Sequence, residues 1–180
     1  WVSLDAGDND PVRFWRYVVA ALDRVRPGIA SELAPFLGAP GSGSFDGLVS
    51  QVINELALEP DDVFLVLDDY HVIDAVPVHD SVSYLLEHGP VGLHVVLASR
   101  ADPPLPLARL RGRGELTELR AADLRFTAEE AGKLLRNAVG SSLDDAVVAK
   151  LAARTEGWAA GLQLAAVSLH DHTDVEAFVE

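Results

Sequence analysis

The chain contains no cysteine and no methionine in its 180 residues. Without cysteine it can form neither disulfide bonds nor thiolate metal sites, and this absence fits a reducing compartment such as the cytoplasm. It also has no basic segment followed by an apolar leader, and no apolar run approaches the roughly 18 residues of a membrane-spanning helix. We therefore expect a cytoplasmic protein that is neither exported nor inserted in a membrane.

Positive charge is scarce as well, because 14 lysine and arginine residues stand against 28 aspartate and glutamate residues, a net charge of −14. Such a surface repels phosphate backbones, so we do not expect this segment to bind nucleic acid itself. Apolar residues make up 49% of the chain, and its length fits one good-sized domain or one domain plus part of another. Because the sequence opens on Trp1 inside an expected strand, we interpret it as a piece of a longer protein.

The most informative stretch is the apolar run Val63–Leu67, which ends in the consecutive carboxylates Asp68 and Asp69. Such a run predicts a strand that is buried on both faces in the middle of a parallel sheet. Ligands of these sheets bind at the carboxyl ends of the strands. The pattern is that of a Walker B segment, in which one carboxylate holds Mg²⁺ and a neighbouring acid orients the attacking water. The alternative is that both carboxylates only end the strand and begin a turn.

The residues before position 127 alternate between strand and helix patterns. Strands are predicted at 1–5, 63–67 and 93–98, with short edge pieces at 116–120 and 124–126. Helices are predicted at 11–26, 29–37, 45–56 and 78–88, with a brief helical turn at 107–110. This order of elements predicts an α/β fold with a parallel sheet.

From Thr127 onward the sequence predicts helices only, at 128–138, 143–154, 158–170 and from 174 onward. Thr127 followed by Glu130 has the spacing of a capping box. We therefore expect two domains: an α/β core at 1–126 and a truncated helical lid at 127–180.

The glycine-rich stretch 38–47 could suggest a phosphate-binding loop. A Walker A loop needs an apolar strand before its glycines and a lysine after them, and neither is present here. We interpret this stretch as a connector between helices.

Several segments together resemble the ATPase region of the maltose-regulon activators. These are large LuxR-type bacterial transcription regulators of the STAND class of signal-transduction ATPases. The matching segments are 1–11 with Phe14-Trp15, then 65–73, 96–104, 118–131 and 155–165. They follow the order found in that family and span nearly the whole chain.

The resemblance implies a P-loop NTPase-like parallel sheet that lacks its first strand and P-loop, followed by an all-helical lid. In this fold class the missing strand lies between the strand at 93–98 and the piece at 116–120. We therefore expect either a gap filled by a second molecule or an altered local strand arrangement.

The resemblance also assigns roles to individual residues. Asp68 would be the Mg²⁺-associated acid and Asp69 the catalytic acid near the attacking water, while Arg100 would contact the γ-phosphate. Gly161 would belong to a lid turn that approaches the nucleotide. Related ATPases have proline two residues after this glycine, whereas this chain has Gln163, so the lid is not expected to contact the base directly.

Two functions are consistent with these features. In the first, the chain is the switch region of a transcription activator, in which ATP or ADP with Mg²⁺ controls self-association. The intact protein would be a slow ATPase, with an inducer or inhibitor on other domains and DNA on a domain outside this chain. This segment alone would be inactive because the P-loop is missing. In the second, the chain is a nucleotide-independent protein-interaction module or a degenerate NTPase domain.

Three other features have both a structural and a functional interpretation. His71 could join the two aspartates in a metal site, but a turn histidine that bonds to backbone is the preferred interpretation. The arginines at 109, 111 and 113 could bind phosphate, although a solvated loop is preferred. Trp158 is expected to pack the lid helix into the core.

Overall fold

The computed structural model describes residues 1–37, 45–58, 61–140 and 143–171. The chain divides into two compact units, Trp1–Arg113 and Gly114–Glu180. Each unit has its own hydrophobic core, so each is described by itself. The predicted connector at 38–47 and the helix expected from 174 onward lie largely or wholly outside the described residues.

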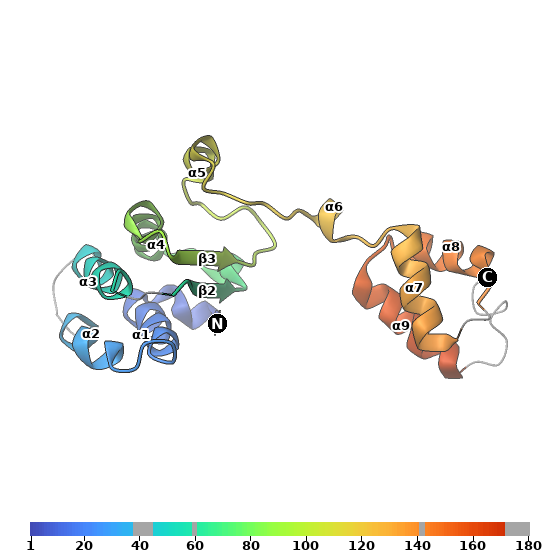
Figure 1. The fold of residues 1–180 in the computed structure, drawn as a ribbon, viewed down its shortest axis with the longest axis horizontal. Helices are drawn as coiled ribbons and strands as arrows, with labels where there is room; N and C mark the ends of the chain where they lie inside the picture. Colours follow the sequence, from blue (N-terminus) through green and yellow to red (C-terminus); the bar gives the residue numbers. More distant parts are fainter. Residues whose placement is uncertain (38–44, 59–60, 141–142, 172–180) are drawn as a thin grey trace. The chain divides into compact units, whose positions relative to one another are not determined.

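The first unit is built on a parallel sheet in the order β1-β2-β3 (Figure 1). Its strands are β1 (Val2–Ser3), β2 (Val63–Asp68) and β3 (Leu93–Leu97). Val2 of β1 pairs with Leu67 of β2, and Leu67 pairs in turn with Leu97 of β3. The predicted α/β fold with a parallel sheet is confirmed.

Helices of the first unit follow the predicted pattern closely. They are α1 (Pro11–Leu22), α2 (Ile29–Leu37), α3 (Asp46–Leu56), α4 (Val76–His88) and α5 (Leu107–Arg113), with the 3₁₀ helices η1 (Ala6–Asn9) and η2 (Tyr70–Val72). Helix α1 begins where the sequence predicts, because the Asp10 side chain accepts hydrogen bonds from the backbone N–H groups of Val12 and Arg13. Pro11 then occupies the first helical position, where a missing N–H costs nothing.

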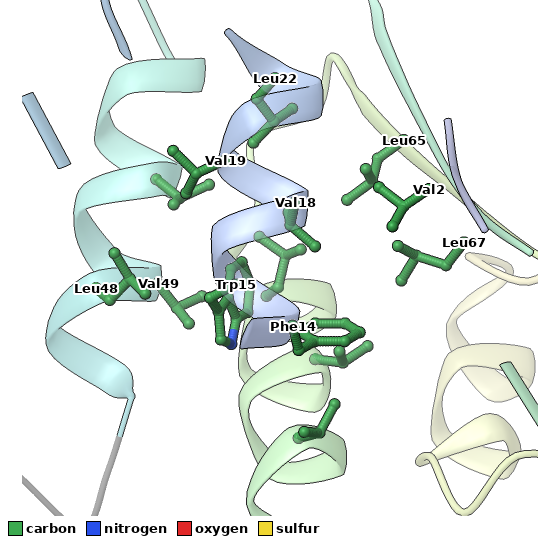
Figure 2. Close-up of a cluster of buried hydrophobic side chains, with 14 of the residues drawn as sticks. Val2, Phe14, Trp15, Val18, Val19, Leu22, Leu48, Val49, Leu65 and Leu67 are labelled. Atoms are coloured by element: carbon green, nitrogen blue, oxygen red, sulfur yellow. The ribbon is translucent and has the colours of Figure 1, made fainter. Parts of the chain in front are cut away.

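The core of the first unit lies between the sheet and α1. Figure 2 shows Phe14 and Val18 of α1 pointing toward the strands, while Val19 points toward α3. The labelled partners on the strands and on α3 are Val2, Leu65, Leu67, Leu48 and Val49. The Trp15 indole is fully buried, and its Nε1–H donates to Ser81 Oγ at 3.0 Å, which joins α1 to α4.

The prediction that β2 is buried on both faces is wrong. Side chains on one face of β2 are buried, but Phe64 on the other face is 63% exposed, and Val96 of β3 is also exposed. Phe64 stacks on His94 with ring centroids 4.7 Å apart. An apolar run does not show whether both faces are covered, because that depends on which other elements pack there.

The predicted edge pieces at 116–120 and 124–126 are also wrong. Residues 115–120 have no regular secondary structure, and a short helix, α6 (Ala121–Leu124), follows. Among the described residues, β3 therefore pairs with β2 alone and the sheet ends there. Extended backbone becomes a strand only beside a partner that accepts its ladder of hydrogen bonds, so composition alone is misleading here.

The second unit contains a small helical core. Its helices are α6, α7 (Ala128–Val139), α8 (Asp145–Arg154) and α9 (Ala159–Asp171). Thr127 and Glu130 form the predicted capping box at the start of α7. The core side chains are Ala131, Leu135, Leu143, Val147, Val148, Leu151, Leu162, Ala166 and Leu169. In the described part of the chain, no helix combines the length and apolarity needed to cross a membrane.

Between α8 and α9 the chain makes a close backbone contact that requires glycine. Gly157 has φ of +74°, and a Cβ built on it would lie 2.6 Å from the backbone oxygen of Phe126. Its carbonyl accepts a hydrogen bond of 2.8 Å from the Phe126 N–H. This contact joins the segment before α7 to the turn that follows α8.

Candidate functional site

The carboxyl ends of β2 and β3 lie side by side and define the candidate site. Beyond the last pair of the register, Leu67 with Leu97, the Ala98 N–H donates to the Leu67 carbonyl at 3.0 Å. The Tyr70 N–H in turn donates to the Ala98 carbonyl at 2.9 Å. Because of these bonds, β2 and β3 stay side by side beyond their last paired residues. Asp68-Asp69 and Ser99-Arg100 therefore lie at the same edge of the sheet.

Asp68 is the last residue of β2 and is partly buried. Its backbone carbonyl accepts a hydrogen bond of 3.0 Å from the Leu4 N–H, which places it next to the end of β1. Its Oδ1 accepts from the Asp69 N–H at 3.0 Å. Within the described residues its Oδ2 accepts no hydrogen bond, so one carboxylate oxygen is available to a ligand.

Asp69 adopts the left-handed backbone conformation, with φ of 57° and ψ of 34°. This conformation is uncommon for residues other than glycine, although aspartate and asparagine tolerate it better than most. Its side chain is 54% exposed. A strained residue at the end of a central parallel strand is typical of a functional position.

Behind Asp69, the next residue anchors the turn to the core. The Tyr70 side chain is fully buried and its hydroxyl lies 3.0 Å from His79 Nδ1 of α4. Burial raises the pKa of the Tyr70 phenol and lowers the pKa of the His79 imidazole, so both groups are neutral near pH 7. The turn after Asp69 thus rests on an uncharged hydrogen-bonded pair.

His71 does not complete a metal site with the two aspartates. Its Nδ1 lies 3.9 Å from Asp69 Oδ1 and has no hydrogen-bond partner in the structure, so the predicted backbone bond from that nitrogen is not formed. Across the described ranges, no group of three or more His, Asp or Glu side chains could hold a metal ion. A cation here would need oxygen ligands from water or from a bound phosphate.

Arg100 is exposed and follows the end of β3 by three residues. The loop start is held locally by Ser99, whose Oγ–H donates to the Ala101 carbonyl at 2.6 Å. Among the described residues Arg100 has no ion-pair partner, so the alternative in which it pairs with Asp69 or Asp102 has no support. Its guanidinium is available to an anionic ligand.

Gly161 lies in the second unit, in the first turn of α9. A Cβ at this position would lie 3.0 Å from both Cβ and Cγ2 of Thr155, so glycine permits the close packing of α9 on the end of α8. The structure places Asp68, Asp69 and Arg100 at the same edge of the sheet in the first unit. It describes Gly161 only within the second unit.

Two other sequence interpretations need correction. Trp158 is not a core residue, since it is 41% exposed and lies under the Arg125 guanidinium at 5.6 Å. Arg109, Arg111 and Arg113 belong to helix α5 and not to a loop, and Arg109 pairs with Glu87 of α4 at 2.6 Å. A tryptophan ring can lie at the surface when an arginine packs over it, because the cation–π interaction with the guanidinium stabilises the exposed ring.

Sequence reasoning missed Asn9, the residue that joins the loop after β1 to the loop after η2. Its side chain bonds to the backbone of Val72, Asp74 and Ala75. The only signal in the sequence is an asparagine directly before the Asp10-Pro11 helix start. Such residues commonly bond to nearby backbone, so their long-range partners are not apparent from the sequence.

Comparison with known proteins places the chain beside two kinds of bacterial protein. No family model matches it. It is 35% identical over 173 residues to the HTH-type transcriptional regulator MalT of Cronobacter sakazakii, which covers 96% of this chain and 19% of the relative. It is 34% identical over 174 residues to the serine/threonine-protein kinase PknK of Mycobacterium tuberculosis, which covers 97% of this chain and 16% of the relative.

The MalT of Yersinia enterocolitica gives a similar match, 35% identical over 168 residues. The chain thus spans less than a fifth of the length of these curated relatives, 19% of either MalT and 16% of PknK. These matches confirm the resemblance to the maltose-regulon activators that the sequence motifs indicate.

Proposed function

Because this chain is MalT-like over nearly its whole length, we propose that it is the nucleotide-sensing part of an ATP-dependent bacterial transcription regulator. ATP and ADP favour different assembly states of the intact protein, and slow hydrolysis resets the switch. DNA and an inducer or inhibitor bind to other domains of that protein, which acts in the cytoplasm. The relation to transcription regulators is supported by the MalT matches, and the nucleotide switch is what we add to it.

The observation that supports the switch is the meeting of two carboxylates and one arginine at a single edge of the sheet. Asp68 has one oxygen without a hydrogen bond from a described residue, Asp69 is half exposed, and Arg100 has no ion-pair partner in the described part of the chain. This donor set fits the nucleotide. One carboxylate with water and phosphate oxygens suits Mg²⁺, and a guanidinium forms forked hydrogen bonds with phosphate.

Each residue then has a separate task. Asp68 holds Mg²⁺ through its free oxygen, and Asp69 orients the attacking water. Arg100 binds the terminal phosphate that ATP has and ADP lacks, so its contact gives the protein different affinities for the two nucleotides. When bound, Mg²⁺ neutralises charge that develops on the phosphates.

The Walker A glycines and lysine are not among these 180 residues. Backbone N–H groups of that loop supply most phosphate contacts in such sites. Hydrolysis and tight nucleotide binding are therefore proposed for the intact protein and not for this segment alone.

A second function has one observation in its favour. The exposed sheet face formed by Phe64, His94 and Val96 offers an apolar surface to another element or protein. An interaction module that works without nucleotide would use such a surface. A coding sequence that has no Walker A motif before Trp1 would favour this function.

The test compares Arg100→Ala with Arg16→Ala in the intact protein. Arg16 is also exposed and has no ion-pair partner among the described residues, so it controls for loss of surface charge. Hydrogen bonds to charged groups contribute about 1.5–3 kcal/mol, so Arg100→Ala should weaken ATP binding by about 10-fold or more. ADP binding should change by less than about 2-fold. An equal loss for ATP and ADP, or a loss of thermal stability alone, would remove the sensor role.

A further inference from the structure

One side chain joins the two loops that border the candidate site. Asn9 is the last residue of η1, in the loop that follows β1. Its distant partners lie at the end of η2 and just after it, more than sixty residues later. Both loops follow the carboxyl ends of neighbouring parallel strands. The contact therefore spans the edge where Asp68 and Asp69 lie.

The Asn9 amide uses its full hydrogen-bonding capacity. Its Nδ2 donates to the carbonyl oxygens of Ala6 at 3.1 Å and Val72 at 2.9 Å. Its Oδ1 accepts from the N–H groups of Asp74 at 2.7 Å and Ala75 at 2.8 Å. A primary amide can donate two hydrogen bonds and accept two, so all four are used here. Its nitrogen faces carbonyl oxygens and its oxygen faces N–H groups. Aspartate lacks the donors, and glutamine is one methylene longer.

The turn that presents Asn9 is itself held firmly. The Asp5 side chain accepts from the Gly7 N–H at 2.6 Å, and the Asp5 N–H donates to Asp8 Oδ2 at 2.9 Å. Asp8 is almost fully buried, and its Oδ1 lies 3.0 Å from Arg13 Nε of α1. The backbone of Asn9 is thus held in place by η1 and α1, independently of its bonds to the second loop.

The segment from Asp69 to Ala75 is held at both ends. At its start, Tyr70 is buried and bonded through its N–H to Ala98. At its end, the N–H groups of Asp74 and Ala75 bond to Asn9. Asp69, with its left-handed backbone, directly precedes the first anchor, and its carbonyl accepts a hydrogen bond of 3.0 Å from the N–H of Val72, whose own carbonyl is bonded to Asn9. Strained conformations persist where the surrounding structure fixes them on both sides.

We propose that Asn9 is a positioning residue of the nucleotide site, an inference that rests on the function proposed above. Its amide fixes the 72–75 loop and so keeps the Asp69 carboxylate in place for orienting water. Removing the amide lets the loop and the Asp69 backbone relax, which misplaces the carboxylate. The phosphate contact of Arg100 comes from a different strand end and does not depend on Asn9.

The experiment measures ATP hydrolysis by the intact protein in three variants. Asn9→Ala removes all four hydrogen bonds, while Asn9→Asp keeps the acceptor and the size of the side chain but removes both donors. Asn54→Ala makes the same chemical change on an exposed position of α3 and serves as the control. We expect Asn9→Ala to lower kcat by about 10-fold or more, because small misplacements of a catalytic group have large effects. KM should stay within about 3-fold, and Asn54→Ala should match the wild type.

Hydrogen exchange without nucleotide supplies an independent readout. The amides of Asp74 and Ala75 should exchange faster in Asn9→Ala than in the wild type or in Asn9→Asp, which keeps their acceptor. A kcat for Asn9→Asp between those of the wild type and Asn9→Ala would support the proposal. If Asn9→Ala failed to fold, a kcat for Asn9→Asp below that of the wild type would test the proposal in its place.

The outcomes separate this inference from the function on which it rests. If Asn9→Ala exchanged faster at these amides yet kept the wild-type kcat, Asn9 would be only structural and this inference alone would be overturned. A parallel fall of kcat in Asn54→Ala would overturn it too. An intact wild-type protein that neither bound nor hydrolysed ATP would overturn the proposed function, and this inference with it.

Discussion

The left-handed backbone of Asp69 predicts that alanine and glycine at this position have different effects on stability. Both substitutions remove the carboxylate, so they should be equally harmful to any role of Asp69 with nucleotide. They differ in backbone preference, because a left-handed conformation costs an L-residue about 1–2 kcal/mol and costs glycine almost nothing. The φ of 57° at Asp69 lies in the centre of that region.

The magnitude follows from two opposing terms. Alanine in place of Asp69 meets the full steric cost, whereas aspartate tolerates the conformation better than alanine does. Glycine avoids the steric cost but loses about 0.5–1 kcal/mol through the greater freedom of the unfolded chain. We therefore expect Asp69→Gly to be more stable than Asp69→Ala by about 1 kcal/mol.

Urea unfolding followed by near-ultraviolet circular dichroism would measure this difference. The buried Trp15 and Phe14 rings, 5.6 Å apart and nearly perpendicular, give the first unit a tertiary signal. Aspartate-to-alanine substitution at the exposed Asp80 is a suitable control for the loss of a charge. Equal unfolding free energies for Asp69→Ala and Asp69→Gly would show that the Asp69 backbone is not left-handed in solution.

Three further predictions concern other parts of the chain. Burial lowers the pKa of His79 below its unfolded value of about 6.5, so the native state should lose stability as the pH falls from 6.5 through the folded pKa; urea midpoints at pH 7.5 and 5.5 should differ less in His79→Leu than in the wild type. Gly157→Ala should destabilise the second unit by about 2 kcal/mol or more, because its Cβ would lie 2.6 Å from the Phe126 carbonyl oxygen; an unchanged melting profile would contradict that contact. Residues 1–180 alone should bind ATP weakly, since the Walker A backbone is missing from them; titration calorimetry that gave micromolar affinity would refute this.

Much of the fold could be predicted because its signals are local. Helix α1 starts at the predicted residue since an aspartate cap and a first-turn proline are encoded side by side, and α7 starts at its predicted capping box. Parallel pairing of β2 and β3 follows from the helix between them. These features depend on residues that are close in sequence.

The features that sequence reasoning missed depend on distant partners. The burial of Phe64 depends on whether another element packs over its face of the sheet. The structure of 116–120 likewise depends on whether a strand lies beside it. Trp158 has the composition of a core residue but lies against Arg125 at a surface. That Asp68 and Arg100 follow strands ending at the same edge was predictable from parallel-sheet topology, whereas the hydrogen bonds of Asn9 across that edge were not. The roles of these site residues stay predictions.

In the described part of the chain, β3 has an unpaired edge and Phe64 lies on an exposed sheet face, and both affect how the chain behaves in solution. Unpaired strand edges and exposed apolar faces promote association between molecules, and mutual repulsion of like-charged molecules opposes it. With a net charge of −14, copies of this chain repel one another strongly at neutral pH and low salt. That repulsion vanishes near the isoelectric point of about 4.6 and is screened within about 3 Å at 1 M salt. Colloidal stability of the isolated chain is therefore governed by its carboxylates, and mild acid or high salt should bring the sheets together before the fold is lost.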